Sequence, residues 1–209
     1  MNTEPFLLSK LSTFKLDPSH QRLFDDAILT NAGNAIWRSR KKNEIHDFLA
    51  LAQVSKRIRI RTIDLSVDLR ILFDFFCPVP TLPHVDQDLV IRDRATLGLT
   101  YTEDSVRNSK PGYSFLQILS PSQVWLPNVS DEEVGIQALC LGAILPPGIL
   151  IKELTLLAYA ALTMQSVQLD ALDSAGVMNG KSAQWWKINQ HRFPLTQDSF
   201  IPASKAQST

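Results

Sequence analysis

Cysteine is scarce in this chain, neither sign of charge is in excess, and long apolar runs are absent. The 209 residues include 2 cysteines, and 21 basic side chains are balanced by 21 acidic ones. So few cysteines argue against the disulfide framework of a secreted scaffold. A net charge of zero argues against a protein that binds nucleic acid through bulk positive charge. We therefore expect no nucleic-acid partner and no disulfide scaffold.

The apolar segments are short. The longest runs from Ala138 to Ile151 and is broken by Gly142, Pro146 and Pro147, so it is too interrupted to cross a bilayer. The first residues lack the basic and apolar regions of a signal peptide. We therefore expect a soluble protein of a reducing compartment, located in the cytoplasm, with no membrane partner.

Histidine and cysteine are not arranged as metal ligands. No histidine lies near another in the sequence, and none forms a metal spacing with a cysteine. Cys77 follows two phenylalanines at the end of a predicted strand, and we interpret it as a core or loop residue. No metal site is predicted. The histidines are His20, His46, His84 and His191.

The length suits one domain, and a hydrophobic fraction of 44% is enough to build its core. We assign residues 19–200 to this domain. Residues 1–18 are interpreted as an N-terminal arm. Residues 201–209 are small and polar and are predicted to form a disordered tail.

Helical signals dominate the first quarter of the chain. A helix is expected from about Ser19, because the preceding Asp17-Pro18 is a helix-start signal. Residues 31–34 follow, and the pattern leaves open whether they interrupt one helix or separate two. A second stripe with helical spacing consists of Ile45, Phe48, Leu49 and Ala52.

From Lys56 the apolar period changes to two, which is typical of half-buried antiparallel strands. Strands are predicted at 57–61, 67–75, 89–101 and 113–119, which gives a four-stranded antiparallel meander. Prolines at 78, 80 and 83 end the second strand and favour an extended loop.

The last third of the chain is again helical. A helix is predicted over 149–169, and because it is apolar almost all round we expect it to be buried. A loop follows at 173–176, and a final helix is predicted over 179–190. Helices before and after an antiparallel meander predict the α+β class.

Cys140 is the most informative residue, because of what lies on either side of it. Leu126-Pro127-Asn128 precedes it, Leu141 follows it, and Pro146-Pro147 introduces the apolar helical pattern. This order of a Pro-Asn turn, a Cys-Leu pair and a proline-led helix resembles the active-site region of ubiquitin-conjugating enzymes.

The resemblance extends from about Lys56 to Phe200 and is strongest from Val124 to Trp186. The proline-rich segment 75–83, the acidic loop 170–173 and the segment Val177-Met178-Asn179 also look like parts of that family's pattern. The resemblance implies a ubiquitin-conjugating-enzyme-like fold with an N-terminal helix, the meander, an active-site flap and C-terminal helices.

Two departures make the chain look like a divergent member. Leu126 stands where the family has histidine, and the gap between Asn128 and Cys140 is longer, with an acidic insertion at 131–133. In this the chain most resembles the bacterial ubiquitin-conjugating-like proteins. Those proteins are encoded beside an activating enzyme, a ubiquitin-like modifier and a deubiquitinase-like peptidase, in gene sets tied to antiphage defence.

The function implied by the resemblance is that of a transferase. Cys140 would accept a ubiquitin-like modifier as a thioester from an activating enzyme and pass it to an amine of a target protein. The expected partners are therefore the modifier, the activating enzyme and the target. No cofactor is expected, because the activating enzyme consumes the ATP.

Three further residues are candidates for this chemistry. Asn128 could donate an N–H to the oxyanion of the reaction, or it could hold the flap that shapes the site. Asp170 and Asp173 could orient or deprotonate the incoming lysine. The alternative for both acids is ordinary turn chemistry, because aspartate favours turns.

Other interpretations of the same residues stay open. Cys140 could be an inert buried cysteine, since free cysteine is among the most buried residue types. The protein could then be an inactive binding scaffold with the same fold. A cysteine hydrolase is a third possibility, although none of the histidines has a recognisable catalytic context.

Two further features have two interpretations each. The basic cluster at 38–42 could meet an acidic partner such as the activating enzyme, although a solvated helix end is the simpler interpretation. Trp185-Trp186 is interpreted as a packing anchor, with a partner-binding surface as the alternative.

Overall fold

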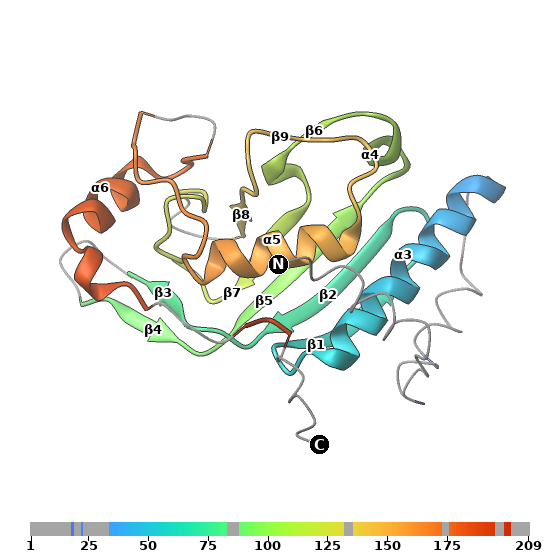
Figure 1. Ribbon diagram of the computed structural model, residues 1–209, viewed down its shortest axis with the longest axis horizontal. Coiled ribbons are helices and arrows are strands. Elements are labelled where there is room, and N and C mark those ends of the chain that lie inside the picture. Colours follow the sequence, from blue (N-terminus) through green and yellow to red (C-terminus); the bar gives the residue numbers. More distant parts are fainter. Residues whose placement is uncertain are drawn as a thin grey trace, which may run out of the picture.

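An antiparallel sheet with helices packed on one face forms the α+β architecture predicted above (Figure 1). The computed structural model describes residues 18, 22, 34–82, 88–131, 136–172, 176–194 and 199–201. In this part of the chain the main sheet has five strands in the order β1-β2-β5-β7-β8, with every neighbouring pair antiparallel. Their bounds are β1 Ile58–Asp64, β2 Leu69–Phe75, β5 Ala95–Tyr101, β7 Leu116–Ser120 and β8 Gln137–Leu139.

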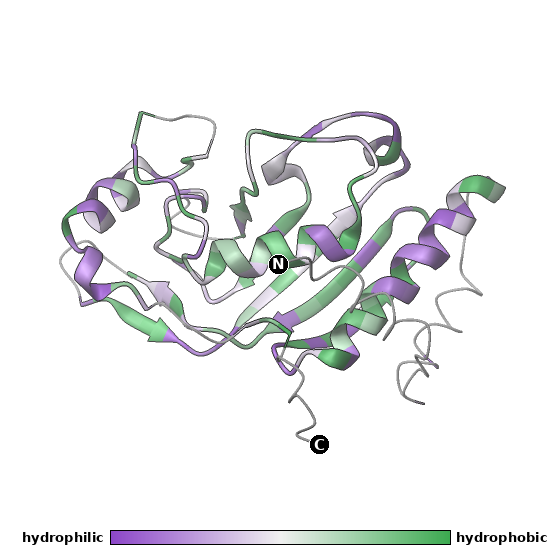
Figure 2. Ribbon diagram, viewed as in Figure 1, coloured by the Kyte–Doolittle hydropathy of each residue, from purple (hydrophilic) through white to green (hydrophobic). Residues whose placement is uncertain are grey.

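The alternation of side chains decides which face of the sheet meets the helices. In β1, Ile58 and Ile60 are buried whereas Arg59 and Arg61 are exposed. The buried face packs against α3 (Ala35–Val54) and α5 (Ile151–Leu162). The ring centroids of Phe48 and Phe73 are 5.5 Å apart, and those of Phe75 and Tyr159 are 5.8 Å apart. Figure 2 shows the middle of α3 mostly purple and α5 green toward its C-terminal end.

The predicted third strand, 89–101, is in fact two strands. Strand β4 (Val90–Arg92) pairs with β3 (Val79–Thr81), which lies within the proline-rich segment, and the two form a separate ribbon. Only β5 joins the main sheet. An apolar period of two cannot reveal this division, because the period stays the same when a strand changes its partner.

Two other strand predictions need correction. Val67 lies outside β2 and is 68% exposed. The fourth strand, β7, begins at Leu116 because the turn η1 (Gly112–Ser114) occupies the residues before it. The fifth strand, β8, was not predicted, since three residues are too few to show a period. Short elements β6 (Lys110–Pro111), β9 (Ile144–Leu145) and α4 (Glu103–Arg107) complete this region.

Helix α5 ends at Leu162, well before the predicted end at 169. Met164 has a φ of 59°, and the amides of Gln165 and Ser166 both donate to the carbonyl of Ala160, at 2.9 and 3.2 Å. A left-handed residue with such bonds is a usual helix C-terminus. The residues after Met164 are therefore free to form the wall of a pocket described below. The helix is also not buried all round, since Leu157 is 38% exposed.

The final helix, α6 (Gly180–Ile188), agrees with its prediction and is followed by the turn η2 (Gln190–Arg192). Trp186 is fully buried and donates its Nε1 hydrogen to the carbonyl of Trp125 at 2.6 Å. The packing-anchor interpretation is therefore confirmed for Trp186. Trp185 is half-buried, and the guanidinium of Arg192 lies 5.3 Å from its ring centroid.

The N-terminal predictions are only partly described. The arm, the helix expected from Ser19 and the tail fall outside the described residues except at positions 18, 22 and 201. Asn34 is the N-cap of α3 and accepts a hydrogen bond from the amide of Trp37 at 2.8 Å. The apolar stripe that includes Ile45 and Phe48 therefore belongs to a helix that begins at Ala35. Within the described ranges, no helix is long and apolar enough to span a membrane.

Part of the basic cluster at 38–42 faces the protein interior. Lys41 is fully buried and donates to the carbonyl of Leu65 at 2.6 Å. Arg40 forms an ion pair with the buried Glu44 at 2.7 Å and donates to the carbonyl of Gly148 at 2.8 Å. The interpretation of the whole cluster as a solvated helix end is wrong, because α3 uses two of these cations to attach itself to the segments it covers.

Glu44 also accepts a hydrogen bond from the amide of Ile151, at 2.7 Å, and so ties α3 to the first turn of α5. Burial raises the pKa of this carboxyl above its usual value of 4.5, although the Ile151 amide and Arg40 oppose the shift. A raised pKa means that the folded state binds the proton more tightly than the unfolded chain. The contribution of Glu44 to the free energy of unfolding is thus present below pH 4.5, and it is lost as the pH rises through the pKa that Glu44 has in the folded protein.

The Glu44→Gln variant removes this titration and tests its sign. We expect the unfolding free energy of the wild type minus that of the variant to be larger at about pH 4 than at about pH 8. Urea unfolding at a series of pH values measures the difference. A difference that stays constant or grows toward alkaline pH would contradict the assignment to Glu44.

Candidate functional site

The Pro-Asn turn at 126–129 is held by the segment that leads into α6. The amide of Val129 donates to the carbonyl of Leu126 at 3.2 Å, which closes the turn. The carbonyl of Pro127 accepts from the amides of Met178 and Asn179, at 2.7 and 2.9 Å. Together with the bond from Trp186 to Trp125, these contacts join the turn firmly to the C-terminal part of the fold.

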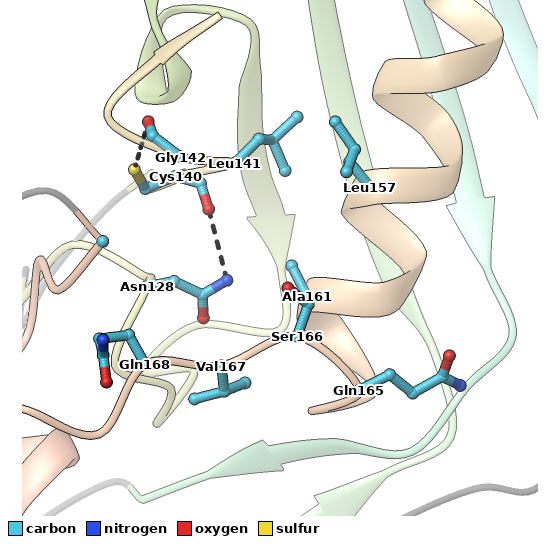
Figure 3. A pocket seen from close by; sticks show the side chains of 11 residues that line it. Asn128, Cys140, Leu141, Gly142, Leu157, Ala161, Gln165, Ser166, Val167 and Gln168 are labelled. Carbon is cyan, nitrogen blue, oxygen red and sulfur yellow. Dashed lines mark hydrogen bonds between the residues drawn. The ribbon is translucent and has the colours of Figure 1, made fainter.

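Cys140 lies directly beside this turn, as the motif order predicted. Its amide donates to the carbonyl of Asn128 at 2.8 Å, and the side-chain Nδ2 of Asn128 donates to the carbonyl of Cys140 at 3.4 Å (Figure 3). An isolated bridge between Val129 and Leu139 continues the pairing. Backbone and side chain of Asn128 thus both hold the segment that carries the thiol.

The geometry distinguishes the two roles considered for Asn128. In Figure 3 the Asn128 amide points at the backbone carbonyl of Cys140, whereas the sulfur points away from it toward Gly142. The Oδ1 atom of Asn128 is buried and has no hydrogen-bond partner among the described residues. The hydrogen bond from Asn128 to the Cys140 carbonyl is the contact expected of a residue that holds the flap, the segment between Asn128 and Cys140. Asn128 does not face the sulfur in this arrangement.

The thiol of Cys140 is nearly covered, with the residue 6% exposed, and donates to the carbonyl of Gly142 at 3.3 Å. Cys140 is one of the residues that line a pocket of about 400 Å³. The other lining residues are Asn128, Leu141, Gly142, Leu157, Ala161, Gln165, Ser166, Val167, Gln168 and Gly176.

The described lining of the pocket is partly polar and uncharged. Its polar side chains other than Cys140 are amides and one hydroxyl, so none of the described lining residues is a general base. The sequence interpretation missed residues 165–168, because it placed them inside a helix. The only sequence signal for the early helix end is the run of polar residues Thr163 to Gln168, interrupted by Met164 and Val167.

Asp170, the one candidate acid that the structure describes, is not brought to the thiol. Asp170 is exposed and does not line the pocket. Its carboxylate accepts from the amide of Leu172 at 3.1 Å, and its own amide donates to the side chain of Gln168 at 3.1 Å. This is the turn chemistry that was the alternative for Asp170. Asp173 lies outside the described residues.

The acidic insertion also has a local structural role. Asp131 forms an ion pair with Lys181 at 3.3 Å and accepts from Asn179 at 3.5 Å, so it contacts the start of α6. The other two acidic residues of the insertion lie outside the described part of the chain. Asp131 therefore connects the segment between Asn128 and Cys140 to the start of α6, and it does not reach Cys140.

Neither of the two described histidines lines the pocket. His46 lies on α3, where it is 3.6 Å from Asp47, and His191 is exposed on η2. His20 and His84 lie outside the described residues. In the part of the chain that can be assessed, no three His, Cys, Asp or Glu side chains are grouped as metal ligands.

Cys77 is a contrasting thiol. It is 2% exposed within the core, and burial raises its pKa to about 12. At about pH 8 such a thiol is ionised in only about one molecule in 10,000. Since the thiolate is the nucleophile, Cys77 is chemically inert in the folded protein.

We therefore expect native protein treated with iodoacetamide at about pH 8 to gain one label, on Cys140 and not on Cys77. Peptide mapping by mass spectrometry identifies the labelled residue, and unfolding in guanidinium should allow the second label. Label on Cys77 in folded protein, or equal labelling of both cysteines, would show that the core around Cys77 opens readily.

The comparison with known proteins adds no relative. No protein-family model, curated protein or solved structure matches this chain. The functional argument consequently rests on what the residues around Cys140 can do. They hold one cysteine at a pocket whose described lining side chains are uncharged and partly apolar, with its backbone amide and carbonyl both hydrogen-bonded to Asn128.

Proposed function

We propose that this protein is a conjugating enzyme for a ubiquitin-like modifier, with a ubiquitin-conjugating-enzyme-like fold. The observation that carries the proposal is the pairing of Cys140 with the Pro-Asn turn. Asn128 holds both the amide and the carbonyl of Cys140, and both residues line a pocket. The order of strands β1, β2, β5 and β7 before this site is compatible with such a fold.

The proposed chemistry is two acyl transfers at one sulfur. The Cys140 thiolate attacks the thioester carbon of the modifier on the activating enzyme, a new C–S bond forms, and the thiolate of the activating enzyme leaves. A target amine then attacks the new thioester. The C–N bond forms, the C–S bond breaks, Cys140 leaves as a thiolate, and the amine proton passes to solvent.

The absence of charge among the described lining residues is compatible with this reaction. A thioester is reactive toward amines, and a thiolate is a good leaving group, so acyl transfer from sulfur makes modest demands on a neighbouring base. We assign Asn128 to positioning the flap, because its Nδ2 contacts the Cys140 carbonyl. The antiphage context, the activating enzyme and the protein target follow from the motif resemblance as parts of the same proposal.

Leu126 stands where ubiquitin-conjugating enzymes have a histidine, and this difference is compatible with the proposed function. It is fully buried in the hydrophobic cluster. A histidine there would need partners for two ring nitrogens, whereas leucine needs none. The turn is instead held by the bonds to the carbonyl of Pro127, so the proposal does not need a histidine to shape the site.

An inactive binding scaffold is the second candidate. The observation that favours it is the low exposure of Cys140, 6%, together with the bond from its thiol to Gly142. In this alternative the pocket would have no catalytic role, and the thiol would carry no modifier.

The deciding experiment combines the protein with an activating enzyme and modifier encoded beside it, with ATP, and separates the products on a non-reducing gel. The transferase predicts an adduct of the two masses that disappears with thiol reductant. Absence of this adduct, when the activating enzyme is demonstrably charged with modifier, would rule out the transferase in favour of the scaffold.

A further inference from the structure

Two glycines meet immediately beside the thiol. Gly112 begins η1, and Gly142 follows Cys140 in the loop before β9. The amide of Gly112 donates to the carbonyl of Gly142 at 3.1 Å, and the carbonyl of Gly112 accepts from the amide of Leu141 at 3.4 Å. The contact continues the pairing of β6 with β9, in which Pro111 lies opposite Ile144.

This approach is too close for any side chain at position 112. A Cβ atom on Gly112 would lie 2.2 Å from the carbonyl oxygen of Gly142 and 2.6 Å from its nitrogen. Both are backbone atoms, so a side chain could be accommodated only by moving the loop. Gly142 itself has a φ of +138°, a conformation that residues with a Cβ rarely adopt. The chain thus uses glycine twice at one contact, once for space and once for conformation.

The same Gly142 carbonyl also accepts the hydrogen bond from the Cys140 thiol, at 3.3 Å. Its position therefore decides what the sulfur faces. A carbonyl oxygen carries partial negative charge, so it accepts an S–H hydrogen and repels a negative charge on sulfur. If the oxygen moved, the sulfur would lose this partner and this repulsion.

We propose that Gly112 and Gly142 are positioning residues that hold a carbonyl against the Cys140 thiol and so keep the sulfur turned toward that carbonyl until transfer. The inference deepens the proposed function and rests on it in one respect, namely that Cys140 is the acceptor of the modifier. Before transfer, the Gly142 carbonyl holds the Cys140 sulfur through the hydrogen bond from the thiol. Transfer then requires the loop 141–144 to release the sulfur.

The test is the rate of Cys140 alkylation by iodoacetamide in three variants, measured across pH by mass spectrometry. Gly112→Ala displaces the Gly142 carbonyl by a clash, and Gly142→Ala displaces it by making the backbone relax. Gly98→Ala is the matched control, because its Cβ would meet only the side chain of Leu119, at 3.6 Å. None of the variants needs the modifier or the activating enzyme.

We expect Gly112→Ala and Gly142→Ala to be alkylated about threefold to tenfold faster than wild type near neutral pH, the range that loss of one neutral hydrogen bond implies. The gain should shrink at alkaline pH, because a sulfur that has lost its hydrogen no longer donates to the Gly142 carbonyl. Loosening of the fold alone would instead raise the rate equally at every pH. Gly98→Ala should match the wild type.

Should Gly112→Ala fail to fold, Gly142→Ala decides alone, because its Cβ has room, with Leu145 at 3.9 Å as the nearest atom. A folded Gly142→Ala protein with the wild-type rate and pH profile would overturn the proposal, as would a gain that is uniform across pH. Faster alkylation of the variants without any modifier adduct would support the role of the two glycines and overturn the proposed transferase function. A modifier adduct without faster alkylation would support the transferase function and overturn the role of the two glycines.

Discussion

Cys140→Ala is expected to abolish the reductant-sensitive adduct with the modifier completely, because the sulfur is the only atom proposed to carry the acyl group. Cys140→Ser keeps a nucleophile of similar size but replaces the thiolate by a hydroxyl. Any adduct that it forms would be an oxygen ester, which forms more slowly and resists thiol reductant. The pair of variants therefore separates loss of the nucleophile from loss of the site.

The matched control is Cys77→Ala. Cys77 is the other cysteine of the chain, and it is buried with a raised pKa, so its removal should leave the adduct unchanged. Non-reducing gels with and without reductant, at equal concentrations of charged activating enzyme, measure all three variants. An adduct that persists in Cys140→Ala and disappears in Cys77→Ala would reverse the assignment of the carrier.

Trp186→Ala is expected to lower the unfolding free energy by about 3–5 kcal/mol, the usual cost of removing a fully buried large aromatic side chain. The indole contacts the rings of Trp185 and Phe193, with centroids 4.8 and 5.0 Å away. Its Nε1 hydrogen bond to the carbonyl of Trp125 is lost as well. Because that carbonyl precedes the Pro-Asn turn, the variant should also loosen the turn beside Cys140.

Trp185→Ala is the control for this effect. Trp185 has the same side chain on the same helix but is half-buried, and we expect a loss of about 1 kcal/mol. Urea unfolding followed by circular dichroism measures both variants. Equal losses for the two tryptophans would mean that Trp186 is no special anchor and that the turn is held by other contacts.

Local sequence patterns predicted the sheet well where side chains alternate between core and solvent. The arginines of β1 and the apolar residues of β2 lie on the faces that a period of two implies. The same patterns failed at 89–101 and at 149–169. The first segment changes its strand partner, and the second leaves the helix at Met164. The change of strand partner leaves the local spacing of apolar residues unchanged, and the early helix end is marked only by the polar run from Thr163 to Gln168.

The basic cluster at 38–42 shows a related limit. Lysine and arginine are usually solvated, yet Lys41 is fully buried and Arg40 pairs with a buried glutamate. The reason is tertiary. Carbonyls at Leu65 and Gly148, distant in sequence, lie where these side chains can reach them. No pattern within α3 indicates such acceptors.

By itself the sequence determined the α+β class, the first strands of the sheet and the juxtaposition of Asn128 with Cys140, because each depends on local spacing or on motif order. Only the tertiary structure decided which groups surround the sulfur. It keeps Asp170 in a turn of its own, brings residues 165–168 to the pocket and sets the Gly142 carbonyl against the thiol through Gly112. The contacts of Gly112 with Gly142 and of residues 165–168 with the pocket join segments that are far apart in the chain. Their geometry comes from packing, which a one-dimensional pattern does not contain.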